Sequence, residues 1–162
     1  MPRNSSSRPP RRRSPDAPAT RNQAPARPEA HTPCPCGQDP GRPYGECCGP
    51  LHAGGAAVTA RALMASRYSA FALRDEAYLL HTWHPDHRLL AVSFDPGVRW
   101  TGLEILDTTG GGPFHTEGTV EFRAHYSDRG RPGAMHELSR FTRLEGRWVY
   151  LDGTEPSERP SN

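Results

Sequence analysis

Four cysteines lie within a span of fifteen residues near the start of the sequence, and no other cysteine follows. They form two pairs separated by ten residues, Cys34 with Cys36 and Cys47 with Cys48. Two disulfides would suit a small secreted protein, but we recognise no export signal in the sequence. Adjacent cysteines also pair poorly with each other, because a disulfide between neighbours is strained. The cluster therefore favours a metal site over disulfides.

Zinc is the metal that best matches this pattern. It takes four ligands in a tetrahedron, at about 2.3 Å from each sulfur, and two short turns with two cysteines each can supply them. Four thiolates leave no open position for water, so such a site is structural rather than catalytic. We expect one Zn²⁺ bound by Cys34, Cys36, Cys47 and Cys48. The alternative is that His52 replaces Cys48, since imidazole also binds zinc readily.

The residues around the cysteines resemble a known module. Cys-Pro-Cys-Gly followed by Tyr-x-x-Cys-Cys-Gly, at positions 34–49, is similar to the SEC-C motif, a zinc-binding module found at the C-terminus of the translocase motor SecA and in many bacterial proteins. The usual form has about eight residues between the cysteine pairs, two fewer than this chain. In SecA the module contacts protein partners and the ribosome, so the resemblance implies a docking role for this segment.

Residues 1–33 differ in composition from the rest of the chain. They contain seven arginines against two acidic residues, and no aromatic residue, leucine, isoleucine or valine. Such a segment cannot bury enough apolar surface to offset the entropy lost on ordering, so we expect it to be disordered. Its basic run at 11–13 could contact nucleic acid, but the whole chain uses arginine and no lysine, so we do not favour this role. No apolar stretch is long enough to span a membrane, and we expect a cytoplasmic protein.

Two helices are predicted after the cysteine cluster. Thr59 is a suitable N-cap for a helix over 60–74. The apolar stripe of that helix comprises Leu63, Met64, Tyr68 and Phe71. Asp75 caps a second helix over about 76–83, which ends because the residue before a proline avoids the helical conformation. Residues 86–92 are expected to add another short turn of helix.

The apolar pattern changes to a period of two from about residue 98. Strands are predicted over 98–106, 114–126, 134–143 and 147–152, with tight turns at 127–130 and 145–146. One face of the second strand carries Val120, Phe122, Ala124 and Tyr126. Helices followed by an antiparallel meander indicate an α+β fold with the helices packed on one face of the sheet.

Five blocks of this second part resemble, in order, the YchJ-like family. They are Ser66-Arg-Tyr-Ser-Ala-Phe71, Tyr78-Leu-Leu-His-Thr-Trp-His-Pro85, Trp100-Thr-Gly-Leu103, Glu137-Leu-Ser-Arg-Phe141 and Gly146-Arg-Trp-Val-Tyr-Leu-Asp-Gly153. In this bacterial family, which has no assigned activity, a SEC-C motif precedes a domain similar to nuclear transport factor 2. The resemblance covers about 33–156 and implies a cone of helices wrapped over a curved antiparallel sheet. It divides the chain into a disordered tail at 1–33, a zinc knuckle at 34–52 and a nuclear-transport-factor-2-like domain at 57–156.

Few residues of the second domain suggest chemistry. The best constellation is at the end of the second helix and comprises His81, His84, Asp86 and His87. There, His84 could act as a general base oriented by Asp86. Glu137 and Arg140 could reach a pocket from the sheet. Structural roles are the stronger interpretation: His84 ends a helix, and Glu137 forms an ion pair with Arg140 or Arg67.

These observations favour a binding protein over an enzyme. No nucleophile elbow, phosphate loop, metalloprotease helix or dinucleotide fingerprint occurs. Our leading hypothesis is a cytoplasmic protein with structural zinc, whose knuckle docks a protein partner or the ribosome and whose cone domain binds a partner or a small-molecule ligand. The first alternative is a small lyase, isomerase or hydrolase that uses His84 or Glu137. The second is nucleic-acid or ribosome binding through the basic tail and the knuckle.

Overall fold

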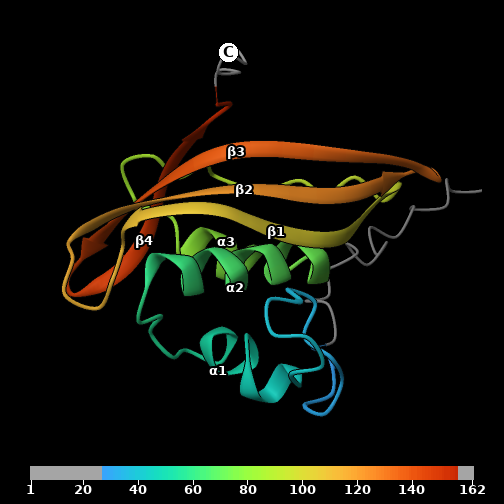
Figure 1. Ribbon diagram of the computed structural model, residues 1–162, viewed down its shortest axis with the longest axis horizontal. Coiled ribbons are helices and arrows are strands. Elements are labelled where there is room, and N and C mark those ends of the chain that lie inside the picture. The colour runs from blue at the N-terminus through green and yellow to red at the C-terminus, as the bar shows by residue number, and fades with distance from the viewer. Residues whose placement is uncertain (1–26, 157–162) are drawn as a thin grey trace, which may run out of the picture.

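Helices cover one face of a four-stranded antiparallel sheet in the computed structural model, which describes residues 27–156. The elements in chain order are the 3-10 helix η1 (Tyr44–Glu46), the helices α1 (Gly49–His52), α2 (Ala60–Leu73) and α3 (Glu76–His81), and the strands β1 (Val98–Gly110), β2 (Glu117–Asp128), β3 (Arg131–Leu144) and β4 (Arg147–Thr154). The strands lie in the order β1-β2-β3-β4. Figure 1 shows α2 and α3 beneath the curved sheet, with the N-terminal segment on the far side of α2. The predicted α+β architecture is confirmed.

Both predicted helix caps are present. The Thr59 hydroxyl accepts a hydrogen bond from the Ala62 N–H at 3.0 Å, and the Asp75 carboxylate accepts one from the Tyr78 N–H at 3.1 Å. Each satisfies an N–H group that has no partner inside its helix. The second predicted helix corresponds to α3, which ends at His81, two residues before its predicted end. No helix within residues 27–156 is long and apolar enough to cross a membrane.

The meander is closed by two tight turns at the predicted positions. In each turn both central residues, Arg129-Gly130 and Glu145-Gly146, have positive φ, which is the conformation of a two-residue hairpin loop. The predicted inner face of β2 is correct, because Val120, Phe122 and Ala124 are at most 2 % exposed. β1 is longer than predicted, since its polar end at residues 107–110 pairs with β2 without showing an alternating apolar pattern.

The predicted helical turn at 86–92 is wrong. A single hydrogen-bonded turn forms at 84–87, where the His87 N–H donates to the His84 carbonyl at 3.0 Å, and the chain then runs on without regular structure. Leu89 and Leu90 are exposed. A helix here would have no buried apolar face to stabilise it, and short helices need one.

The N-terminal segment begins earlier than the cysteines suggested. Residues 29–33, which we assigned to the tail, are hydrogen-bonded to the loop opposite: the Tyr44 N–H donates to the Thr32 carbonyl at 2.7 Å and the Gly45 N–H to the Ala30 carbonyl at 2.9 Å. We therefore use the name knuckle for residues 29–52. Residues 1–26 of the predicted disordered tail lie outside the described residues.

The knuckle packs on both α2 and the sheet edge. Its buried cysteines and Tyr44 belong to the same apolar cluster as Leu63 of α2 and Phe141 of β3. The Gln38 side-chain amide donates to the Leu103 carbonyl of the edge strand β1 at 2.8 Å. As a result, α2 is buried on opposite sides, between the sheet and the knuckle.

Candidate functional site

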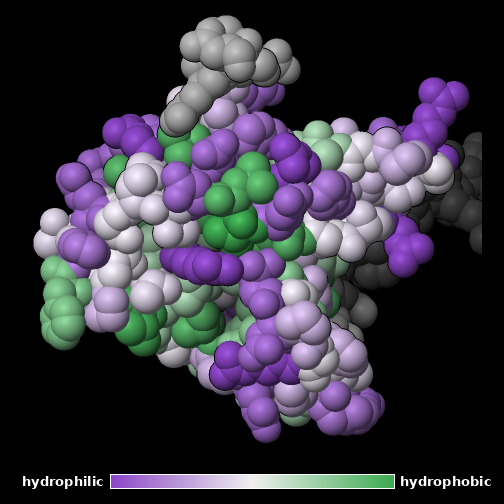
Figure 2. All heavy atoms as spheres, in the orientation of Figure 1, coloured by the Kyte–Doolittle hydropathy of each residue, from purple (hydrophilic) through white to green (hydrophobic). Residues whose placement is uncertain are grey.

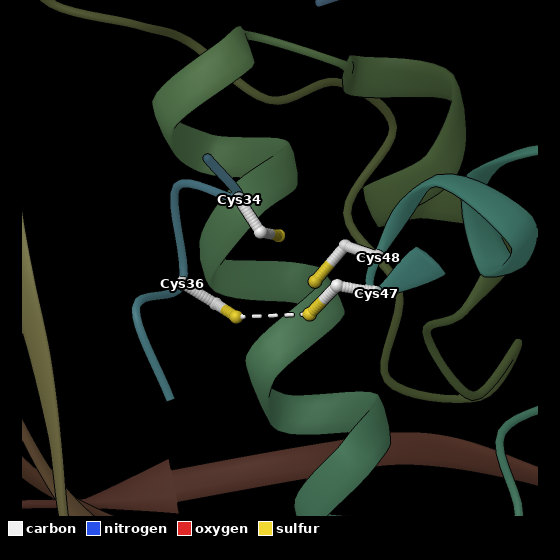
Figure 3. A group of neighbouring side chains, drawn as sticks. All are labelled: Cys34, Cys36, Cys47 and Cys48. Carbon is white, nitrogen blue, oxygen red and sulfur yellow. Dashed lines mark hydrogen bonds between the residues drawn. The ribbon is translucent and has the colours of Figure 1, made fainter. Parts of the chain in front are cut away.

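The four cysteines converge on one point, as predicted from their spacing. Figure 3 shows two of them on the loop before η1 and two on the segment that leads into α1, with all four sulfurs directed toward a common centre. The four Sγ atoms lie within 4.8 Å of one another, and those of Cys36 and Cys47 are 3.5 Å apart. All four thiols are free. A tetrahedron with sulfur at about 2.3 Å from its centre has edges of about 3.8 Å, so this donor set fits a metal ion.

The sulfur cluster is mostly buried, with only Cys47 partly exposed, and it is supported by α2. Cys36 and Cys48 are 1 % and 2 % exposed. Ser69, on α2, donates its hydroxyl to the Cys48 Sγ at 3.3 Å and lies 3.8 Å from the Cys34 Sγ. A hydroxyl that donates to sulfur stabilises the thiolate form that a metal requires.

The cysteine thiols are unevenly acidic when no metal is bound. Hydrogen bonds from the Cys36 and Cys48 thiols lower the pKa of Cys34. The hydrogen bond between Cys36 and Cys34 raises the pKa of Cys36 to about 12. The hydrogen bond between Cys48 and Cys34 likewise raises the pKa of Cys48. Burial raises the pKa of Cys47. Ionising all four sulfurs together is unfavourable because of their mutual repulsion, and a bound cation would offset that repulsion.

His52 does not belong to the sulfur cluster. Its Nδ1 lies 2.6 Å from the Tyr44 hydroxyl and its Nε2 lies 2.8 Å from the Ser66 carbonyl. Because a carbonyl only accepts, Nε2 carries the proton and Nδ1 accepts from the tyrosine. Burial lowers the pKa of His52. Both ring nitrogens are therefore occupied in a bridge from the knuckle to α2, and this arrangement does not support His52 as a replacement for Cys48.

A cavity of about 230 Å³ lies between α2 and the inner face of the sheet. We call it the cone pocket. Most of its lining is apolar, and its aromatic walls are Tyr68, Phe71, Trp83, Trp100, Phe122 and Tyr150. Its polar groups come from Arg67, Glu137 and Ser139. The pocket is therefore an apolar chamber with a few fixed polar groups, as is usual for small-molecule sites.

Arg67 is the most unusual residue of the pocket. It is 3 % exposed, and its Nη1 donates to the Leu79 carbonyl at 2.8 Å and to the Thr82 hydroxyl at 2.7 Å. Its guanidinium carbon lies 4.5 Å from the centre of the Tyr150 ring, an attractive cation–π distance. Burial lowers the pKa of Arg67 to about 10, so the group remains a cation at neutral pH.

Glu137 reaches the pocket from β3 and is held in place there. Its Oε1 accepts hydrogen bonds from the Ser139 hydroxyl at 2.9 Å and from the Tyr150 hydroxyl at 3.1 Å. Burial raises the pKa of Tyr150, and the nearby carboxylate adds to this effect. The predicted ion pairs of Glu137 do not form. Arg140 points to the opposite face of β3, where its Nε donates to the Asp152 carboxylate at 2.7 Å, and Arg67 makes no ion pair with Glu137.

The predicted histidine constellation lies outside the cone pocket. His84 and Asp86 do come close, with 3.9 Å between Nδ1 and the carboxylate, but Nδ1 accepts a hydrogen bond from the Asp86 backbone N–H. Asp86, His81 and His87 are exposed. None of these residues lines the pocket. The structure therefore separates them from Glu137, the one predicted candidate that the pocket contains.

Sequence reasoning missed the position of Arg67 in the pocket and the contact of Ser69 with sulfur. A signal for both was present. Between Arg61 and Arg74 the helix has a single charged residue, Arg67, among apolar and small residues, so this part of the helix is expected to be buried on more than one side. A serine or arginine inside such a helix must find a buried partner.

Comparison with known proteins identifies relatives over most of the chain. The family model described as "YchJ, middle NTF2-like domain" matches residues 59–153. A UPF0225 protein of Streptomyces coelicolor is 57 % identical over 122 residues, which is 75 % of this chain and 94 % of that protein. A UPF0225 protein of Geobacter sulfurreducens is 45 % identical over 137 residues, which is 79 % of this chain and 82 % of that protein.

Two solved structures share the fold. A SEC-C motif containing protein from Rhodopseudomonas palustris is 34 % identical with a TM-score of 0.66, over 78 % of this chain and 100 % of that one. A second, from Psychrobacter arcticus, is 28 % identical with a TM-score of 0.63, over 80 % of this chain and 86 % of that one. The match covers both the knuckle and the sheet domain, so the predicted combination of a SEC-C motif with a nuclear-transport-factor-2-like domain is confirmed.

Proposed function

The chain belongs to the YchJ-like family of UPF0225 proteins, and we propose that it is a cytoplasmic small-molecule-binding protein with a structural zinc ion in its knuckle. The observation that carries the proposal is the pairing of two buried features on opposite sides of α2. One is the four-sulfur cluster, which contacts one side of the helix. The other is the cone pocket, of which the opposite side of the helix forms one wall.

Zinc is the ion that the sulfur cluster suits best. Four closely spaced sulfurs favour a tetrahedral ion with an affinity for thiolates. Such a site would supply folding energy to the knuckle, which contains only two very short helices and no strand pairing beyond one isolated bridge. A reducing cytoplasm would keep these thiols free for metal.

Metal analysis of the purified protein tests the zinc proposal. Protein prepared under reducing conditions without chelators should contain about one equivalent of zinc. The double variant Cys47→Ser/Cys48→Ser should contain almost none and should lose order in the knuckle. Less than about half an equivalent in the wild type would refute the zinc site.

The cone pocket supports binding of a small ligand. Its volume, its aromatic walls and its few convergent polar groups are the usual properties of ligand sites. Small aromatic acids, amides and amines should be screened by the fluorescence of Trp83 and Trp100, which both line the pocket. If no compound of the three classes binds at millimolar concentration, the ligand-binding role is refuted.

Docking through the knuckle is a further part of the proposal, and its surface favours a polar partner. On the face shown in Figure 2 the lower lobe, which holds the knuckle, is mainly hydrophilic. The knuckle has one arginine against three acidic residues, so it has no basic surface for nucleic acid. Co-sedimentation with ribosomes, compared between the wild type and Cys47→Ser/Cys48→Ser, tests ribosome docking. Equal sedimentation of the two proteins would exclude a role for the folded knuckle.

An enzymatic role for Glu137 is the second candidate function. It is favoured by one observation: Glu137 lies in the pocket beside the hydroxyl of Tyr150, where it could take a proton from a bound ligand. Glu137→Gln separates the two roles, because it keeps the shape of the side chain but removes the base. A pure binding protein would show no turnover of any ligand found in the screen, with or without this substitution.

A further inference from the structure

Arg67 carries a buried charge that no acidic side chain among the described residues contacts directly. Its guanidinium forms no ion pair with any residue in 27–156, although the side chain is almost fully buried. The nearest acidic group in the pocket, Glu137, is engaged by Ser139 and Tyr150 instead. Burying a cation without an anion is unfavourable. The Glu137 carboxylate eases this burial from a distance, but the guanidinium has no anion bonded to it, and a bound carboxylate would supply one.

One edge of the Arg67 guanidinium is free to bind that anion. Nη1 is occupied by the Leu79 carbonyl and the Thr82 hydroxyl, whereas Nε and Nη2 make no hydrogen bond to any part of the chain that the structure describes. Arg67 is one of the residues that line the cavity. The edge formed by Nε and Nη2 presents two parallel N–H groups, the arrangement that binds both oxygens of a carboxylate.

The walls and volume of the pocket select a flat ring. Six aromatic side chains surround the cavity, and aromatic rings pack well against one another face to edge. A dry cavity of about 150 Å³ accommodates benzene. The cavity of about 230 Å³ therefore has room for one ring with two small polar substituents, or for a fused pair of rings.

Glu137 adds a requirement for a hydrogen-bond donor. Its Oε1 already accepts two hydrogen bonds, while its Oε2 accepts none from the described residues. A ligand hydroxyl or amino group would satisfy this oxygen. The negative charge of Glu137 also repels a carboxylate, and so directs the acidic end of a ligand toward Arg67.

We propose that the cone pocket binds a small planar aromatic carboxylate that carries a hydroxyl or amino group, with Arg67 holding the carboxylate and Glu137 accepting from the donor group. This inference rests on the proposed ligand-binding function and names the class of ligand. The ligand carboxylate forms an ion pair with Arg67, the ring fills the space between the aromatic walls, and the donor group reaches Glu137.

The first test uses the full-length, zinc-loaded, reduced wild-type protein and four probes. 4-Hydroxybenzoate has all the proposed features, 4-hydroxybenzamide lacks the charge, benzoate lacks the donor, and tyramine reverses the charge. Binding is followed by tryptophan fluorescence and by the ¹⁵N–¹H resonance of the Arg67 Nε. 4-Hydroxybenzoate should bind at least about tenfold more tightly than its amide, because one charge-assisted double hydrogen bond is lost. It should also shift the Arg67 Nε resonance.

The four probes separate failure of this inference from failure of the proposed function. If the amide or tyramine binds as tightly as the acid, the ligand class is wrong but the pocket still binds ligands. If benzoate binds as tightly as 4-hydroxybenzoate, the role given to Glu137 is wrong. If none of the four probes binds at millimolar concentration, this inference is refuted, and the wider screen of acids, amides and amines decides whether the pocket binds ligands at all.

Variants test the residue assignment. Arg67→Met should weaken 4-hydroxybenzoate at least about tenfold and leave 4-hydroxybenzamide unchanged. Arg61→Met is the matched control, because Arg61 is an exposed arginine on the same helix, and it should change neither affinity. If Arg67→Met does not fold, Glu137→Gln takes its place: it should tighten benzoate, which gains a site without the repelling charge. An unchanged affinity for benzoate in that variant would overturn the pairing of the two residues.

Discussion

Substituting Ser69 by alanine should weaken zinc binding by about 10- to 100-fold. The Ser69 hydroxyl is fully buried and donates to the Cys48 Sγ at 3.3 Å. Its removal leaves the sulfur of Cys48, a residue that is only 2 % exposed, without this donor. A hydrogen bond to a charged group contributes about 1.5–3 kcal/mol, and each 1.4 kcal/mol corresponds to about a factor of ten in affinity. This free energy therefore also corresponds to a loss of about 10- to 100-fold in zinc affinity.

Ser66→Ala is a closely matched control for this experiment. Ser66 lies one turn before Ser69 on the same helix and is equally buried. Its hydroxyl donates to the Leu63 carbonyl at 2.7 Å and lies 2.7 Å from the Tyr78 hydroxyl, and it makes no bond to sulfur. The control should lower the free energy of unfolding by about 1 kcal/mol and leave the zinc affinity unchanged.

Zinc affinity is best measured by competition with a chromophoric chelator at neutral pH under reducing conditions. Circular dichroism of each variant shows whether the fold is retained, so that a loss of affinity is not mistaken for unfolding. The reasoning would be refuted by an affinity of Ser69→Ala within about threefold of wild type. It would also be refuted if Ser66→Ala lost as much affinity as Ser69→Ala.

Three further predictions concern the stability of the fold. Leu79→Ala, at a fully buried side chain, should lower the free energy of unfolding by about 2–5 kcal/mol in urea titrations, whereas Leu90→Ala, at a fully exposed one, should change it by less than about 0.5 kcal/mol. Gly118→Ala should lower the free energy of unfolding by about 1–3 kcal/mol, because the new Cβ would lie 2.5 Å from the Gly111 Cα. Gly102→Ala has open space around its Cβ and should be nearly neutral. A larger loss of stability for Gly102→Ala than for Gly118→Ala would contradict the packing. The hydrogen bond from Arg140 lowers the pKa of Asp152 in the folded protein. The pair therefore stabilises the fold above the unfolded pKa of Asp152, which is about 4, and this contribution is lost as the pH falls through the pKa of the folded state. The cost of Arg140→Gln at neutral pH, which is small for so exposed a pair, should therefore shrink in acid, and a cost that does not change with pH would refute the assignment.

Local signals in the sequence were sufficient for most of the fold. Thr59 and Asp75 both cap helices as predicted, because an N-cap depends on only three or four neighbouring residues. The two hairpin turns were located for the same reason. The convergence of the cysteines was also predictable, since two short loops hold them close in sequence as well as in space.

The composition of the pocket required the tertiary structure. Arg67 and Glu137 are seventy residues apart, and nothing in their local sequence shows that they line one cavity. His84 and Asp86 drew attention because they are close in sequence, yet they form a surface turn. Glu137 and Arg140 lie on opposite faces of β3, as strand parity requires of residues three positions apart. Parity could not show that Tyr150 would bind the first and Asp152 the second.

The geometry of α2 explains why the knuckle and the pocket occur in one domain. Successive residues of a helix are rotated by about 100°, so Arg67 and Ser69 lie about 200° apart, on opposite sides. Met64, Arg67, Tyr68 and Phe71 form the pocket side, at i, i+3, i+4 and i+7. On the other side, Ser69 bonds to sulfur and the Ser66 carbonyl binds His52. The helix that carries the guanidinium is therefore fixed from behind by the sulfur cluster and the buried histidine. A site that holds a buried cation without an ion-pair partner needs such rigid support, because the guanidinium on a mobile helix would move to a solvated position.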